Sequence, residues 1–175
     1  MEQITLRPLT MQDVPALAKA MNNLAVLDNL RDGIPYPYTE KDAEDFIEKS
    51  LAAKAQTQYL RVICHDGIYA GGIGVFRREN IHLRTGEIGY HLAEPFWGRG
   101  IMTEAIRKMC DYIFQNTDII RIFAEPFATN VASCRALEKV GFQFEGIMRQ
   151  NAIKNGKIVD MRLYSVLKSE WECGK

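Results

Sequence analysis

The sequence predicts a single-domain α/β fold of the α+β kind, in which about four helices flank a mixed, mostly antiparallel sheet of about seven strands. The chain has 175 residues, of which 47% are hydrophobic, so one domain covering residues 1–175 can bury a sizeable core. Residues 58–92 alternate with period two in three successive runs, and a helical pattern at residues 101–114 lies between two strand-like runs. The first pattern is typical of an antiparallel meander, and the second indicates a crossover between parallel strands.

The N-terminal part of the chain predicts one strand and two helices. Residues 3–9 alternate as a short strand, and Thr10 to Asp13 form the pattern of a capping box at the start of a helix. Residues 32–38, DGIPYPY, interrupt regular structure because the two prolines fix backbone angles and disfavour helix in the residues before them. A second helix starts near Thr39 and carries apolar residues on one face as far as residue 51.

The rest of the chain predicts six strands and two helices. The runs YLRVICH, IYAGGIGVFRR and TGEIGYHL form three strands, and a turn at Asp66-Gly67 joins the first two. The helix at residues 101–114 leads to a strand at 119–124, and a further helix at 130–140 ends at Gly141. Residues 142–150 and 157–167 make a closing hairpin around Asn155-Gly156.

Charge and cysteine content argue against several function classes. Lysine plus arginine and aspartate plus glutamate each number 22, so no net field recruits nucleic acid or an anionic membrane, and neither partner is expected. The sequence shows no signal-peptide pattern and no apolar run of about 18 residues, which indicates a cytoplasmic protein. The cysteines lack CxxC spacing, so we expect reduced thiols and no metal site at Cys64, Cys110, Cys134 and Cys173.

Residues 95–105, PFWGRGIMTEA, place two glycines just before a predicted helix. The first backbone N–H groups of a helix have no internal partners and carry a partial positive charge, so they form an anion site. Gly98 and Gly100 would let a phosphate approach without a Cβ in the way, and Arg99 would add a charge-assisted contact. In the alternative interpretation the glycines only shape a turn. The P-loop and dinucleotide motifs are absent, which excludes two familiar kinds of phosphate site.

Two motifs lie between Gly86 and Phe142, GEIGYHLAEPFWGRGIMTEAIRKM and NVASCRALEKVGF. Together with the order of elements along nearly the whole chain, they resemble the cofactor core of GNAT-type N-acetyltransferases, most of all the RimJ/RimL ribosomal-protein acetyltransferase branch. The resemblance implies a GNAT-like fold and acetyl-CoA as the acetyl donor. It also implies transfer of the acetyl group to a primary amine, either a protein amino terminus or a small molecule.

The same resemblance implies where acetyl-CoA binds. The pyrophosphate is expected at the glycine loop, the pantetheine arm along the preceding strand, and the thiol near the second motif. The cofactor-binding residues expected on this basis are Tyr90, His91, Leu92, Trp97, Gly98, Arg99, Gly100, Ile101, Met102, Thr103, Asn130, Ser133 and Arg135. Two of them have alternative roles, Trp97 as a core aromatic residue and Arg135 as a solvated helix charge.

The chain departs from the family pattern at three positions. Pro95 replaces the usual Gln or Arg before the glycine loop, as is common in this branch. Leu137 stands where many relatives carry a tyrosine general acid, which leaves Ser133 to hydrogen-bond the departing thiolate. Ala152 stands where some amino-terminal acetyltransferases use a glutamate, so the base of those enzymes does not carry over to this chain.

Attack on a thioester requires a neutral amine, yet an amine of the lysine type has a pKa near ~10.4 and is mostly charged at neutral pH. Period-two alternation puts Glu87 and His91 on one face of their strand, so Glu87 is the first candidate for the base and His91 the second. Both also suit structural roles. Backbone N–H groups near Tyr90 and His91 are expected to stabilise the oxyanion. Cys134 as a nucleophile is a further alternative, although the sequence places no partner beside it.

The loop at residues 30–38 is expected to contribute Arg31, Tyr36 and Tyr38 to the acceptor site. An ordinary surface loop stiffened by proline is the alternative. Two other functions stay open at this point, a non-catalytic acetyl-CoA-binding module and a nucleotide-binding enzyme. A homodimer is an expectation from the family resemblance alone.

Overall fold

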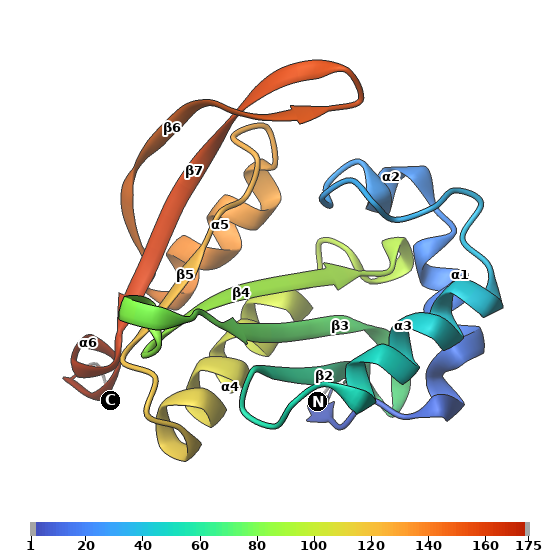
Figure 1. Cartoon of the computed structure of the whole chain (residues 1–175), viewed down its shortest axis with the longest axis horizontal. Coiled ribbons are helices and arrows are strands. Elements are labelled where there is room, and N and C mark those ends of the chain that lie inside the picture. Colours follow the sequence, from blue (N-terminus) through green and yellow to red (C-terminus); the bar gives the residue numbers. More distant parts are fainter. Residues whose placement is uncertain (1–2, 174–175) are drawn as a thin grey trace.

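The computed structural model describes residues 3–173 and contains one seven-stranded sheet (Figure 1). The strand order is β1-β2-β3-β4-β5-β7-β6. β4 and β5 pair in parallel, and the other neighbouring strands pair antiparallel. The strands are β1 (Ile4–Arg7), β2 (Gln58–His65), β3 (Ile68–Arg77), β4 (Thr85–Leu92), β5 (Arg121–Ala124), β6 (Gln143–Lys154) and β7 (Lys157–Leu167). The predicted mixed, mostly antiparallel sheet is confirmed.

The described part of the chain forms six α-helices, where about four were expected. They are α1 (Val14–Met21), α2 (Leu24–Leu27), α3 (Glu40–Ala52), α4 (Ile101–Asn116), α5 (Val131–Val140) and α6 (Lys168–Cys173), with 3-10 turns η1 (Met11–Asp13), η2 (Asn80–His82) and η3 (Glu94–Phe96). The additional helices, α2 and α6, are too short to leave a periodic pattern in the sequence. The predicted capping box at Thr10 is present, and Thr39, the predicted start of a helix, forms a second capping box with Asp42.

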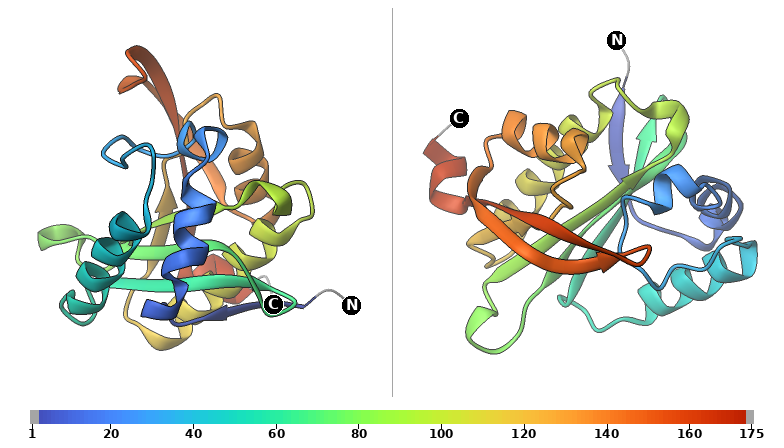
Figure 2. Two further views of the ribbon diagram at one scale, coloured as in Figure 1. Left: turned by 90° about the vertical axis from the view of Figure 1, so that its right-hand side faces the viewer. Right: turned by 90° about the horizontal axis from the view of Figure 1, so that it is seen from above.

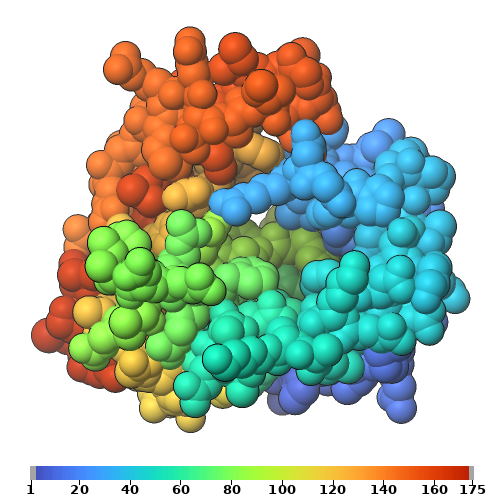
Figure 3. Space-filling view, viewed as in Figure 1, coloured from blue at the N-terminus to red at the C-terminus, as the bar shows by residue number. Residues whose placement is uncertain are grey.

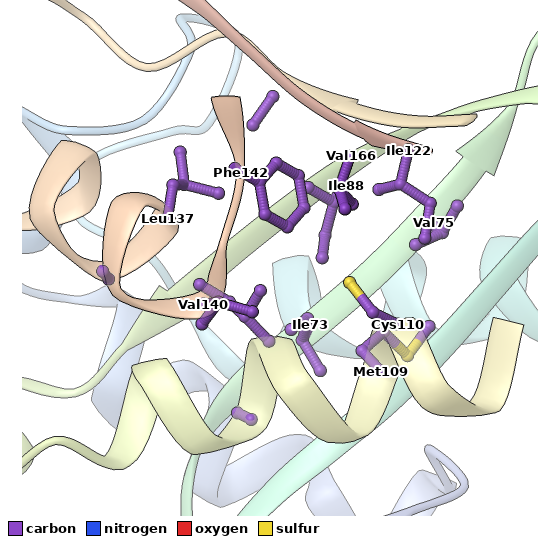
Figure 4. Close-up of a cluster of buried hydrophobic side chains, with 14 of the residues drawn as sticks. Ile73, Val75, Ile88, Met109, Cys110, Ile122, Leu137, Val140, Phe142 and Val166 are labelled. Carbon is purple, nitrogen blue, oxygen red and sulfur yellow. The ribbon is translucent and has the colours of Figure 1, made fainter. Parts of the chain in front are cut away.

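The helices form one layer on each face of the sheet (Figure 2). α1 and α3 cover one face, and α4 packs against the other together with α5. The larger hydrophobic core lies on the α4 and α5 side, where Ile73 and Val75 of β3 and Ile88 of β4 meet Met109 and Leu137 from the two helices (Figure 4). This core fixes the position of β4 relative to the N-termini of α4 and α5.

β4 and β5 separate from each other toward their carboxyl ends, which opens a space in the sheet. Their parallel pairing ends at Glu87 and Phe123. β4 continues beyond this pair to Leu92, whereas Pro126, close behind the end of β5, lacks the backbone N–H that a ladder needs. The two strands therefore diverge beyond the Glu87–Phe123 pair.

The β6–β7 hairpin extends past the other strands of the sheet toward the segment that follows α2 (Figure 1). Lys154 Nζ lies 2.7 Å from Asp32 Oδ1, and Asn155 Nδ2 donates to Asp28 Oδ1 at 2.9 Å. These contacts join the turn of the hairpin to residues 28–32. These contacts close one side of the space between β4 and β5.

Candidate functional site

A cavity of about 880 Å³ lies between the diverging ends of β4 and β5. Its walls come from β4, the N-termini of α4 and α5, the residues after β5 and the segment after α2. The volume is in the range that proteins use for small ligands and cofactors. It is lined by every residue expected to bind the cofactor except Arg99: Tyr90, His91, Leu92, Trp97, Gly98, Gly100, Ile101, Met102, Thr103, Asn130, Ser133 and Arg135.

The start of α4 presents bare backbone to this cavity. Gly98 and Gly100 have φ angles of 73° and 75°, in the left-handed region where a residue with a Cβ is strained. A Cβ added at either glycine would have no neighbour within 4 Å and would project into open space. The amides of the next residues lie in the first turn of a 16-residue helix, where they have no partner within the helix. This arrangement fits a phosphate or pyrophosphate group.

The N-terminus of α5 forms another wall and adds positive charge. The Asn130 side chain accepts a hydrogen bond from the Ser133 amide at 3.1 Å and thereby caps α5. Ser133 Oγ lies 2.7 Å from the Oη of Tyr90 on β4. Arg135 and Lys139 both line the cavity. Lys139 was not predicted, although it follows Arg135 by one helical turn and so lies on the same face of α5.

Two carboxylates lie beside the point where β4 and β5 separate. The guanidinium of Arg31 is hydrogen-bonded to Glu87 and lies 3.4 Å from Glu125 Oε2. Arg78 Nη1 lies 3.6 Å from the second oxygen of Glu87. Burial and the negative charge of Glu87 raise the pKa of Glu125 above its ordinary value. The structure therefore brings the predicted Glu87 and Arg31 together and adds Glu125, which was not predicted.

His91 lies on the same face of β4 as Glu87, as the period-two spacing predicted. Its Nε2 lies 3.0 Å from the Oη of Tyr69. Burial lowers the pKa of His91 to about 4, so the imidazole is neutral at pH 7 and holds a proton weakly. Burial also raises the pKa of Tyr69, which keeps the phenol protonated. His91 is therefore better suited to neutral hydrogen bonding than to the role of a base.

Three predicted site residues do not line this cavity. The Arg99 guanidinium lies 3.2 Å from His65 Nε2 instead. Tyr36 is 55% exposed, and Tyr38 is buried against α1 and α3, where it borders a second cavity. Their roles in binding stay predictions.

Leu137 and Cys134 are both buried, and neither lines the cavity. Leu137 belongs to the hydrophobic core, so it has neither the chemistry nor the position to protonate a leaving group. The position of Cys134 gives no support to a thiol nucleophile. Ala152 pairs with Val159 in the β6–β7 hairpin.

Residues 3–173 contain no group of three or more His, Cys, Asp or Glu side chains arranged to hold a metal ion. In the same part of the chain, none of the helices has the length and apolar character needed to cross a membrane.

Residues 3–143 match the family model described as acetyltransferase (GNAT) domain. The chain is 32% identical to the probable N-acetyltransferase YjcK of Bacillus subtilis, over 97% of this chain and 96% of that protein. It is 24% identical to the spermidine N(1)-acetyltransferase of Escherichia coli K12, over 88% and 80% of the two chains. The solved structure of RimL, the ribosomal L7/L12 alpha-N-protein acetyltransferase, in complex with coenzyme A matches 95% of each chain with a TM-score of 0.86 and 25% identity. The chain therefore belongs to the GNAT acetyltransferase family and is an N-acetyltransferase that uses acetyl-CoA as its acetyl donor.

Proposed function

We propose that the acceptor amine attacks acetyl-CoA directly in the cavity between β4 and β5, and that Glu125 accepts the proton that the amine loses. The observation that carries this proposal is the pair of acids at the point of strand divergence, where Arg31 contacts both Glu87 and Glu125. Two carboxylates at this point attract a positively charged amine to the site of transfer. The acetyl group then passes to the amine without a covalent enzyme intermediate.

The acetyl donor is held mainly by backbone groups. The free amides at the start of α4 bind its pyrophosphate, and Arg135 and Lys139 add positive charge from α5. The backbone of β4 follows the pantetheine arm as far as Leu92, whose carbonyl accepts a hydrogen bond from Trp97 Nε1 at 2.7 Å. This bond supports Trp97 as a cover for the cofactor. Bound acetyl-CoA supplies the thioester carbonyl that the amine attacks.

Glu125 is better suited than Glu87 to accept the proton. Glu87 contacts two guanidinium groups, those of Arg31 and Arg78, whereas Glu125 lies farther from Arg31 than Glu87 does. The raised pKa of Glu125 means that its carboxylate binds a proton more strongly than an ordinary glutamate does. Glu87 holds Arg31 in place and attracts the charged amine before the proton is lost.

The transfer step forms the N–C bond, breaks the C–S bond and moves the amine proton to Glu125. Negative charge develops on the carbonyl oxygen, and we assign its stabilisation to backbone N–H groups near Tyr90 and His91, beyond the last β4–β5 pair. The departing thiolate accepts a hydrogen bond from the Ser133 hydroxyl, whose Oγ is hydrogen-bonded to Tyr90. Burial raises the pKa of Tyr90, so this phenol stays protonated and can donate a hydrogen bond to Ser133 Oγ.

Ser133→Ala is expected to lower kcat by about 10-fold, because one hydrogen bond to a charged group contributes about 1.5 kcal/mol or more. Ser133→Thr keeps a hydroxyl at the same position and should retain most of the activity. Steady-state CoA release gives kcat, and titration gives the Kd of acetyl-CoA. If kcat is unchanged and the Kd rises in Ser133→Ala, Ser133 acts in cofactor binding and not on the leaving group.

CoA release measured with purified protein, acetyl-CoA and a panel of amines tests the proposed reaction. The panel holds peptides with varied first residues, spermidine, aminoglycosides and amino acids. We expect release with one class of acceptor, together with an acetyl mass shift on that acceptor. Accumulation of an acetylated protein when the acceptor is omitted would contradict direct attack.

A homodimer and a cytoplasmic location also belong to this proposal. Light scattering on the purified protein distinguishes the dimer from a monomer.

A further inference from the structure

A second cavity, of about 450 Å³, adjoins the cofactor cavity along β4. It lies between α1 and α3 and the face of β2, β3 and β4 that they cover. Figure 3 shows a hollow on this side of the molecule, between α3 in teal and the light-blue segment that follows α2. Both cavities are lined by Leu30, Ile34, Phe76, Gly89, Tyr90 and His91. They therefore meet at the part of β4 that follows Glu87, the last residue paired with β5.

The walls of the second cavity are mainly apolar. α1 contributes Leu17 and Met21, α3 contributes Phe46, and β2 contributes Leu60 and Val62. A site of this size and character suits an apolar group more than a charged one.

The carboxylates at the rim of this second cavity already have partners. Asp42 is held in the capping box with Thr39. Asp45 lies 2.9 Å from Lys41 Nζ. A second ammonium group of a ligand would have to displace these partners to bind here, which disfavours polyamines.

Glycines make part of the floor of the second cavity, and one of them has space for a Cβ. Gly74 and Gly89 are direct neighbours on β3 and β4. A Cβ at Gly74 would strike Leu60 Cδ2 at 2.4 Å, so the Leu60 side chain lies over Gly74. A Cβ at Gly89 would meet Phe76 Cε2 at 3.6 Å, an ordinary contact. Gly89 therefore leaves room for another molecule where the two cavities meet.

We propose that the second cavity receives the apolar part of the acceptor, so that the preferred acceptors are primary amines that carry a bulky apolar group. The inference rests on the proposed function, because it needs the reacting nitrogen beside Glu125 while the apolar group lies among the side chains of α1, α3 and β2. An arylalkylamine and the first residue of a peptide beginning with phenylalanine share this chemistry.

The test compares initial rates of CoA release for 2-phenylethylamine, spermidine and two peptides that differ only in a first residue of phenylalanine or glycine. We expect kcat/KM for at least one apolar acceptor to exceed that of its polar counterpart by about 10-fold or more, because the apolar group is buried. Preference for 2-phenylethylamine over the phenylalanine peptide identifies a small-molecule acceptor, and the reverse identifies a protein amino terminus.

Gly89→Ala is the variant that tests the location of the apolar group. An added methyl group fits the native fold but narrows the junction, so we expect the KM of the apolar acceptor to rise by about 10-fold, a larger change than that in the Kd of acetyl-CoA. Phe46→Ala enlarges the cavity at a residue that is 44% exposed, and should shift preference toward bulkier amines. Thermal unfolding of both variants checks that they are folded.

The inference is wrong if CoA release is observed and is fastest with spermidine or with the glycine peptide. This result leaves the proposed function intact. It is also wrong if Gly89→Ala leaves the KM of every acceptor unchanged. Absence of release with all four amines contradicts the proposed function itself, together with this inference.

Discussion

Glu125→Gln is expected to lower kcat by about 100-fold at neutral pH, the loss typical of removing a general base. Glutamine has nearly the size of glutamate but does not accept the proton of the attacking amine. The pKa of Glu125 is raised, so the wild-type rate should fall as the pH drops through that raised value and the carboxylate becomes protonated. In the variant this acid limb disappears. Its rate should rise toward the acceptor's own pKa, near ~10.4 for an alkylamine, because more of the amine is then neutral.

Glu87→Gln is the matched control for Glu125→Gln, since both acids contact Arg31. Loss of the Glu87 charge weakens the attraction of the cationic acceptor and the hold on Arg31, so the acceptor KM should rise more than kcat falls. Measurement of kcat and KM across the pH range separates the two variants. A large loss of kcat in Glu87→Gln with normal kcat in Glu125→Gln would assign the base to Glu87, the residue that the sequence alone favoured.

The elements with clear periodicity were predictable because their pattern reports directly on burial. On β3, Ile73 and Val75 point into the core beside α4, while Gly72 and Gly74 lie on the opposite face, which agrees with period-two alternation. The start of α3 was predictable because Thr39 and Asp42 form a capping box within four residues of sequence. α2 lacks such a pattern. Its start depends on the Asn23 side chain, which accepts a hydrogen bond from the Ala25 amide.

The cofactor loop was predictable for a related reason, since the left-handed backbone at Gly98 and Gly100 is a local requirement that glycine satisfies. The directions of the side chains within the loop were harder to predict from the sequence. Arg99 stands between two such glycines, and the path of the backbone turns its guanidinium to His65 and away from the cavity lining.

Glu125 was missed because its environment depends on two segments far apart in the sequence. Its closeness to Glu87 follows from the parallel pairing of β4 and β5, which ends beside both residues. One signal was available, since Glu125 directly follows a predicted strand, and ligands in sheets with parallel strands bind beyond the carboxyl ends of the strands. The sequence does not state how far two strands diverge, so it does not specify which carboxylate meets Arg31.

Gly100→Ala is expected to weaken acetyl-CoA binding by about 100-fold, because two hydrogen bonds to a charged group contribute about 3 kcal/mol together. At a φ of 75° the added Cβ meets no neighbouring atom within 4 Å, and Gly100 lines the cavity where the pyrophosphate is proposed to meet the amides at the start of α4. The same Cβ also strains the backbone by about 1–2 kcal/mol. Calorimetric titration gives the Kd, and chemical denaturation gives the free energy of unfolding.

Gly67→Ala, in the β2–β3 turn, is the control variant. It distinguishes the effect of backbone strain from the effect of a Cβ that obstructs the pyrophosphate. Gly67 has a φ of 80°, and a Cβ there also has no neighbour within 4 Å, but the residue does not line the cofactor cavity. Both variants should therefore lose a similar free energy of unfolding, and only Gly100→Ala should lose acetyl-CoA affinity. Equal affinity in the two variants would mean that the pyrophosphate does not approach Gly100. Loss of affinity in Gly100→Ala alone would show that the missing side chain, and not the backbone turn by itself, is what the cofactor site needs from this glycine.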